Sequence, residues 1–96
     1  MSRANEYTLK EAIEKLLKTY RLDGKLNEVK LVNSWEKVMG KMIANHTKNI
    51  FISKKKLFIT LDSAALREEL FYAKAKIVKM LNDEVGGQVI EEVVFQ

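Results

Sequence analysis

The sequence predicts an α+β domain with the element order ααββαβ, in which helices pack on a three-stranded mixed sheet. Two observations lead to this fold class. Apolar residues recur every three to four positions over residues 8–45 and 64–85, but every second position over residues 50–61. A β-branched segment, residues 89–95, follows the last helical pattern. Because strand–helix–strand connections are nearly always right-handed, this last strand should join the earlier sheet, with the intervening helix across one face.

The first predicted helix begins after Thr8, because Thr8 and Glu11 have the spacing of a capping box. Its apolar stripe consists of Leu9, Ile13, Leu16, Leu17 and Tyr20. Asp23-Gly24 is a turn signal that ends it. A second helix is predicted over residues 27–45, with inward-facing Val29, Val32, Trp35, Met39, Met42 and Ile43. Gly40 inside this helix costs ~1 kcal/mol relative to alanine, which indicates a bend or the close packing of a neighbour.

A β-hairpin is predicted from residues 50–52 and 57–61, joined by a four-residue loop over residues 53–56. This register pairs Ile52 with Leu57 and Ile50 with Ile59 on one face. Phe51 and Phe58 then form a pair on the other face.

A third helix is predicted over residues 64–85, with Ser63 as a candidate N-cap. Its stripe consists of Leu66, Leu70, Ala73, Ile77, Met80 and Leu81. Phe71, Ala75 and Val78 make its apolar surface wider than a one-sided helix needs. Gly86-Gly87 permits a left-handed cap that ends the helix, and the last strand follows.

The length of 96 residues fits one domain, so residues 1–96 are expected to form a single unit in which residues 1–7 are flexible. The chain contains no cysteine, and it has no apolar N-terminal segment or long apolar run, so we expect a cytoplasmic protein without a membrane partner. The net charge of +4 is unevenly distributed. Residues 1–61 hold 13 basic and 6 acidic residues, or +7, whereas residues 62–96 hold 4 and 7, or −3. This asymmetry is typical of a surface that contacts phosphate.

The sequence contains little that could support catalysis. His46 is the only histidine, no serine lies in a glycine-rich elbow, and there is no cysteine. A lone histidine cannot complete a structural zinc site, and no phosphate-binding glycine loop is present. We therefore expect no enzyme activity, no metal and no cofactor. His46 itself is expected to contact the last carbonyls of its helix.

Two features could instead form a binding surface. Lys54, Lys55 and Lys56 lie at the expected hairpin tip and could neutralise phosphates, although lysine-rich turns often serve only solubility. Phe51 and Phe58 could stack on nucleic-acid bases if their face of the sheet is exposed. The opposite expectation, that helices cover both faces and bury both rings, is slightly favoured.

Residues 35–47 carry the most specific pattern in the chain. Trp35, Val38, Gly40, Ile43, Ala44, His46 and Thr47 follow the arrangement Trp-x-x-Val-x-Gly-x-x-Ile-Ala-x-His-Thr. This arrangement resembles the signature of the DciA-like family, and residues 56–70 and 77–95 resemble its later segments. The resemblance implies a K-homology-like domain and a role in loading the bacterial replicative helicase. It also implies mainly structural roles for Trp35, Gly40, His46, Thr47, Glu69 and Leu70.

The chain departs from the family pattern at Asn49 and Leu66, where members often have proline and tryptophan. It also lacks the Gly-x-x-Gly loop with which K-homology domains clamp a nucleic-acid backbone, and the chain shows no disordered tail such as longer members carry. The expected partners are thus a replicative helicase and single-stranded DNA or RNA, contacted through lysines or aromatic rings. The alternative is a protein-interaction module or weak homodimer with no nucleic-acid role, using the surplus apolar surface of residues 64–85 or the Phe51–Phe58 face.

Overall fold

The computed structural model describes residues 8–20 and 23–96, and the expectation for residues 1–7 lies outside these ranges. The helices are α1 (Leu9–Thr19), α2 (Asp23–Asn33), α3 (Trp35–Met39), α4 (Lys41–Asn45), α5 (Ala64–Phe71) and α6 (Lys74–Val85). The strands are β1 (Thr47–Ser53), β2 (Lys56–Leu61) and β3 (Glu92–Phe95). The α+β class is therefore confirmed.

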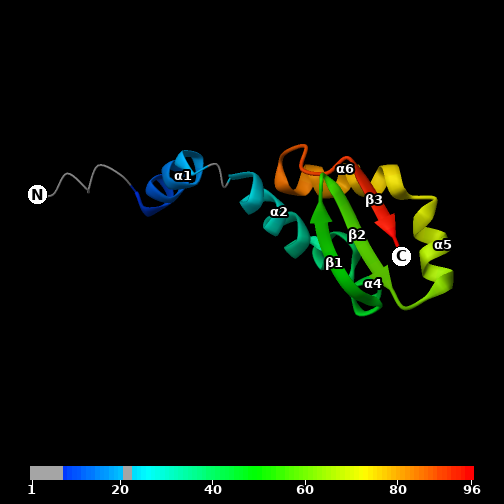
Figure 1. The fold of residues 1–96 in the computed structure, drawn as a ribbon. Coiled ribbons are helices and arrows are strands. Elements are labelled where there is room, and N and C mark those ends of the chain that lie inside the picture. Colours follow the sequence, from blue (N-terminus) through cyan, green and yellow to red (C-terminus); the bar gives the residue numbers. More distant parts are fainter. Residues whose placement is uncertain (1–7, 21–22) are drawn as a thin grey trace, which may run out of the picture.

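The three strands form one mixed sheet in the order β1-β2-β3. β1 and β2 are antiparallel in the predicted register, with Ile50 opposite Ile59 and Phe51 opposite Phe58. β3 joins β2 in parallel, with Val94 opposite Phe58. As Figure 1 shows, α6 lies behind the sheet, so the predicted crossover, with its helix across one face, is confirmed.

The hairpin connection is shorter than predicted. Ser53 pairs with Lys56, which leaves a two-residue turn instead of the expected four-residue loop. Lys54 and Lys55 have φ values of 50° and 63°, and positive φ at both positions is the requirement of a type I′ turn. β1 also begins earlier than predicted, and its pairing with β2 is irregular between Thr47 and Asn49. β3 covers only the last four residues of the strand predicted over residues 89–95.

The predicted helix over residues 27–45 is wrong as a single element, because it is three helices. Ser34 separates α2 from α3, and its hydroxyl donates to the Leu31 carbonyl (2.7 Å). Gly40, with φ 91° and ψ 165°, separates α3 from α4. Nothing lies within 4 Å of a Cβ built on Gly40, so the glycine permits a bend and not a close contact.

The predicted helix over residues 64–85 is also divided, into α5 and α6. The Ala73 amide donates to the Leu70 carbonyl (3.0 Å), a tight turn that redirects the chain. The two predicted ends are confirmed. The Ser63 hydroxyl accepts from the Leu66 amide, and Gly86 is the left-handed cap of α6.

The core lies between the inner face of the sheet and the helices α2, α3, α5 and α6. Its buried apolar residues are Leu31, Trp35, Leu57, Ile59, Leu61, Leu66, Leu70, Ile77, Leu81, Ile90 and Val93. Trp35 is only 4% exposed, as predicted. Val29 and Met42, which were expected to face inward, are exposed: α2 buries Leu31 instead of Val29, and Gly40 turns the chain before Met42.

Asn82 is a buried polar residue that fixes the path into β3. Its Oδ1 accepts from the amides of Val89 (3.0 Å) and Ile90 (3.1 Å), and its Nδ2 donates to the Ile90 carbonyl (2.9 Å). One side chain thus satisfies three backbone groups in a segment that has no strand partner.

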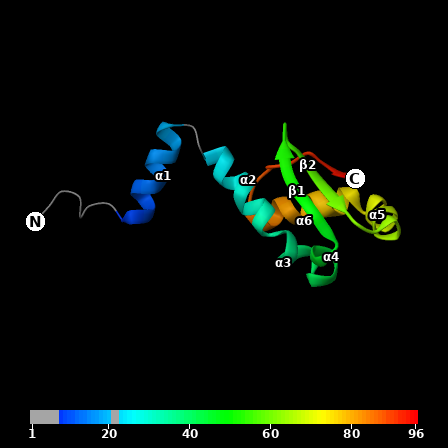
Figure 2. The ribbon, with the colours of Figure 1, turned by 60° about the horizontal axis from the view of Figure 1, so that its bottom comes forward.

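α1 has the predicted capping box, in which the Glu11 amide donates to the Thr8 hydroxyl (3.1 Å) and the Thr8 amide donates to the Glu11 carboxylate (3.3 Å). It buries none of its residues in the described part of the chain. Figures 1 and 2 show it projecting from the rest of the fold. Among the described residues, no helix is long and apolar enough to span a membrane.

Candidate binding surface on the open face of the sheet

One face of the sheet carries no helix in the described part of the chain, and we call it the open face (Figure 1). The alternation along β2 directs Leu57, Ile59 and Leu61 into the core and the intervening residues outward. The outward side chains across the three strands are Asn49, Phe51, Ser53, Lys56, Phe58, Thr60, Glu92 and Val94.

Phe51 and Phe58 stack on the open face, with ring centroids 4.9 Å apart and ring planes 9° from parallel. Val94 is opposite Phe58 on β3, so three apolar side chains form a row across the sheet. Phe51 is 41% exposed and Phe58 is partly exposed. The expectation that helices bury both rings is therefore wrong, because the helices that pack on the sheet cover only its inner face.

Lys54, Lys55 and Lys56, which we call the lysine tip, lie at the end of the hairpin beside this row. Lys56 is two residues from Phe58 on β2, so both belong to the open face. Carboxylates at the start of β3 reach the tip, with Glu91, just before the strand, 4.0 Å from Lys55 and Glu92, its first residue, 3.9 Å from Lys56. Three lysines and two glutamates leave a local charge of +1, and Lys54 has no ion pair among the described residues.

A groove of about 340 Å³ lies between α2 and β1, and we call it the α2–β1 groove. Its lining comprises Lys25, Glu28, Val29, Val32, Asn33, Ile50, Phe51 and Ile52. Phe51 lines this groove and also stacks on Phe58 on the open face. The groove therefore adjoins the open face at Phe51.

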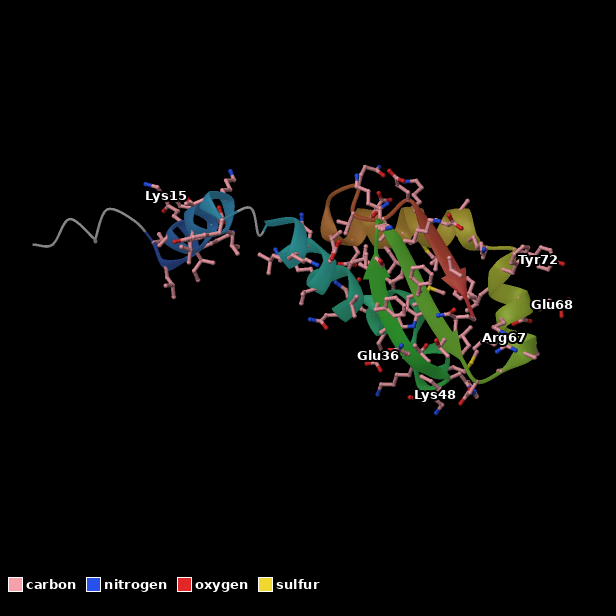
Figure 3. The ribbon with its side chains drawn as sticks, in the orientation of Figure 1. Lys15, Glu36, Lys48, Arg67, Glu68 and Tyr72 are labelled. Atoms are coloured by element: carbon pink, nitrogen blue, oxygen red, sulfur yellow. The ribbon has the colours of Figure 1, made fainter. Side chains whose placement is uncertain are left out.

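His46 is the C-cap of α4, and its backbone amide donates to the Ile43 carbonyl (3.1 Å), in line with the expected contact with the last helix carbonyls, whereas its ring turns to a carboxylate. Its Nδ1 donates to the Asp62 carboxylate (2.6 Å), whose other oxygen lies 3.2 Å from the Lys48 ammonium. The hydrogen bond from His46, followed by that from Lys48, holds the pKa of Asp62 below its usual range. This exposed cluster ties the start of β1 to the end of β2, and Lys48 is labelled in Figure 3.

The family-motif residues are divided between the interior and the surface. The Trp35 indole donates to the Thr47 hydroxyl (3.0 Å), which donates in turn to the Ile43 carbonyl (2.8 Å). Leu70 is buried, whereas Glu69 is exposed on α5. The structure therefore brings the two ends of the Trp-to-Thr pattern together inside the fold, away from the open face.

A second exposed aromatic site lies at the corner between α5 and α6. Phe71 and Tyr72 meet edge to face at 5.6 Å, and the Lys74 ammonium lies 4.7 Å from the Phe71 ring centre. Tyr72 points away from the fold at the end of α5 opposite to Arg67 (Figure 3). The sequence indicated surplus apolar surface at Phe71, but it gave no signal for Tyr72 because a helix was expected to continue there.

No group of three His, Cys, Asp or Glu side chains that could hold a metal ion occurs among the described residues.

The family model described as "Dna[CI] antecedent, DciA" matches residues 8–95. A UPF0232 protein from Corynebacterium glutamicum (strain R) is 37% identical over 62 residues, which are 65% of this chain and 35% of the relative. The match thus spans about a third of that relative's length. No solved structure matches the chain, so its K-homology-like character stays a prediction.

Proposed function

The chain belongs to the DciA family, and from this premise we propose that it is a noncatalytic adaptor in bacterial DNA replication. It binds the replicative helicase and holds single-stranded nucleic acid, DNA or RNA, without sequence preference. One observation carries the nucleic-acid part of the proposal, namely a stacked phenylalanine pair on an uncovered sheet face beside three lysines.

The chemistry of the open face fits a flexible single strand. A base that stacks on Phe51 gains about 1–3 kcal/mol whatever its identity, because every base has an aromatic face. The lysine tip lies at the end of the same hairpin, where ammonium groups can meet the phosphates that flank a stacked base. The row contains no side chain able to read two base edges together, which favours binding without sequence preference.

Fluorescence anisotropy with a labelled oligothymidylate tests the nucleic-acid part. Phe51→Ala should weaken binding about 5- to 150-fold, the equivalent of one lost stacking contact. Phe71→Ala is the matched control, since Phe71 is an exposed phenylalanine on α5 and not on the open face. Equal loss in both variants, or no loss in either, would contradict the proposed surface, and thermal melts confirm that each variant folds.

Titration calorimetry with the replicative helicase of the same organism tests the helicase part. We expect a complex of micromolar or tighter affinity. The Phe51→Ala variant should retain this complex if the helicase contacts a surface other than the open face. No binding at high micromolar concentration would favour the alternative, a protein-interaction or homodimerisation module.

A further inference from the structure

The apolar stripe of α1 has no partner within the described part of the chain. Leu9, Ile13, Leu16 and Tyr20 lie on one face of this helix, and their exposed fractions range from 47% to 77%. An isolated helix of 11 residues is marginal in water, because its few hydrogen bonds barely compensate for the cost of nucleation. Such a helix is stable when its apolar face is covered, so the exposed stripe indicates a missing contact.

The same chain contains a surface that complements this stripe. The α2–β1 groove offers Val29, Val32 and Phe51 among its lining side chains, and Val29 is 55% exposed. The groove follows α2 from Lys25 to Asn33, which is about 12 Å at 1.5 Å per residue. The stripe from Leu9 to Tyr20 extends over about 16 Å by the same measure. The groove can therefore accept most of the stripe.

We propose that α1 of one copy docks in the α2–β1 groove of a second copy, and that the exchange is reciprocal. In the structure, α1 projects away from α2 and the sheet of its own chain (Figure 2), so the stripe and the α2–β1 groove are both open to another molecule. A reciprocal exchange is a closed two-fold arrangement, in which both stripes and both grooves are covered at once. The second copy is the occupant because each chain supplies both halves of the contact.

Phe51 lines the groove, so a docked α1 and a base stacked on Phe51 would compete for the same ring. Self-association is therefore measured without nucleic acid, and its outcome does not depend on the function proposed above. The measurement is the molar mass of the full chain by light scattering and sedimentation over a concentration series.

Three variants define the contact. Leu16→Glu places a charge in the stripe, Val29→Glu places one in the groove, and Lys18→Glu alters the polar face of α1 as the matched control. The wild type and Lys18→Glu should form dimers, whereas Leu16→Glu and Val29→Glu should each be monomeric. Mixing the two monomeric variants should restore a heterodimer, because one intact stripe and one intact groove remain between them.

Three results would overturn the proposal. A wild type that stays monomeric up to millimolar concentration shows that the groove does not accept α1 of another copy. A dimeric Val29→Glu variant shows that the stripes pair with each other instead. Failure of the mixed variants to associate, when the wild type dimerises, shows that the two surfaces do not meet between copies.

A cross-linking measurement covers the case in which a glutamate variant does not fold. The chain has no cysteine, so single-cysteine variants report one contact each. An Ile13→Cys chain mixed with a longer, tagged Val29→Cys chain should give a disulfide-linked product of mixed size. A Lys18→Cys chain mixed with the same partner should give little, and equal yields from both mixtures would count against the proposal.

Discussion

Among single residues, Trp35 contributes to stability in two ways. It fills part of the core, and its indole donates a hydrogen bond to the Thr47 hydroxyl. Trp35→Ala should lower the free energy of unfolding by about 3–5 kcal/mol, through lost burial and the cavity left behind. Thr47→Val should cost less, about 1–3 kcal/mol, because it leaves the indole N–H without its acceptor. Chemical denaturation of both variants measures these costs. A Trp35→Ala variant as stable as the wild type would show that the core does not depend on the indole.

Asp62 provides a pH-dependent contact between the start of β1 and the end of β2. Its pKa in the folded protein lies below the ordinary value of 3.8, because His46 and Lys48 bond to the carboxylate. The contribution of Asp62 to stability is thus present above pH 3.8 and is lost as the pH falls through the lowered pKa of the folded state.

Thermal melts from pH 7 down to pH 2 test this contact. The wild type should lose melting temperature more steeply than Asp62→Asn over the acidic part of this range, since the amide does not titrate. Asp83→Asn is the matched control, because Asp83 forms an ion pair with Lys79 on α6, away from this junction. Parallel curves for the wild type and Asp62→Asn would contradict the assignment.

Single residues differed in how far the sequence could predict them. Trp35 was predicted correctly as buried because the helical spacing of apolar residues indicates which face of the helix is apolar. The Ser63 cap was predicted correctly because serine is a preferred N-cap residue. The contact between His46 and Asp62 joins residues 16 apart in sequence, and it depends on how β1 and β2 meet. Asn82 lies at an ordinary helical position, and its role became visible only when the path of residues 86–91 was known.

Among the structural elements, the turn between β1 and β2 has an unfavourable backbone conformation. Lys54 and Lys55 both have positive φ, which asparagine and glycine adopt far more easily than lysine. The double variant Lys54→Asn/Lys55→Gly should raise the free energy of unfolding by about 1–2 kcal/mol. Denaturation measures the gain, and Lys54→Gln/Lys55→Gln is the control that removes the charges without relieving the backbone. If the double variant is no more stable than this control, the positive φ values of Lys54 and Lys55 do not destabilise the fold.

The helix boundaries show what periodicity can and cannot predict about an element. The predicted stripe residues Val32, Trp35, Met39 and Met42 keep steps of three or four positions across both breaks, so the pattern predicts one continuous helix. Gly40 did signal a bend, whereas Ser34 gave no comparable sign. The corner at Ala73 has neither glycine nor proline, because the turn is set by how α5 and α6 pack on the sheet and not by local propensity.

The charges of the whole molecule are distributed along its length. Lysines occur on α1, α2, α3 and α4 as well as at the lysine tip, whereas the acidic excess lies in residues 62–96. Glu91 and Glu92 bring part of that excess to the lysine tip itself. A phosphate that approaches the tip must therefore compete with two carboxylates that are already in place.

Single-strand binding at the lysine tip should therefore depend on both the lysines and these two carboxylates. Three engaged lysines predict a slope of log affinity against log salt of about −2, from about −0.7 per contact. Replacing the lysine tip with glutamine should flatten this slope, whereas Glu91→Gln/Glu92→Gln should strengthen binding at low salt by freeing two of its lysines. Anisotropy titrations across a salt series measure both effects, with Lys79→Gln on α6 as a control that leaves the slope unchanged. Tight, salt-independent and sequence-selective binding by the wild type would contradict a phosphate contact at the tip, as would an unchanged slope in the glutamine variant.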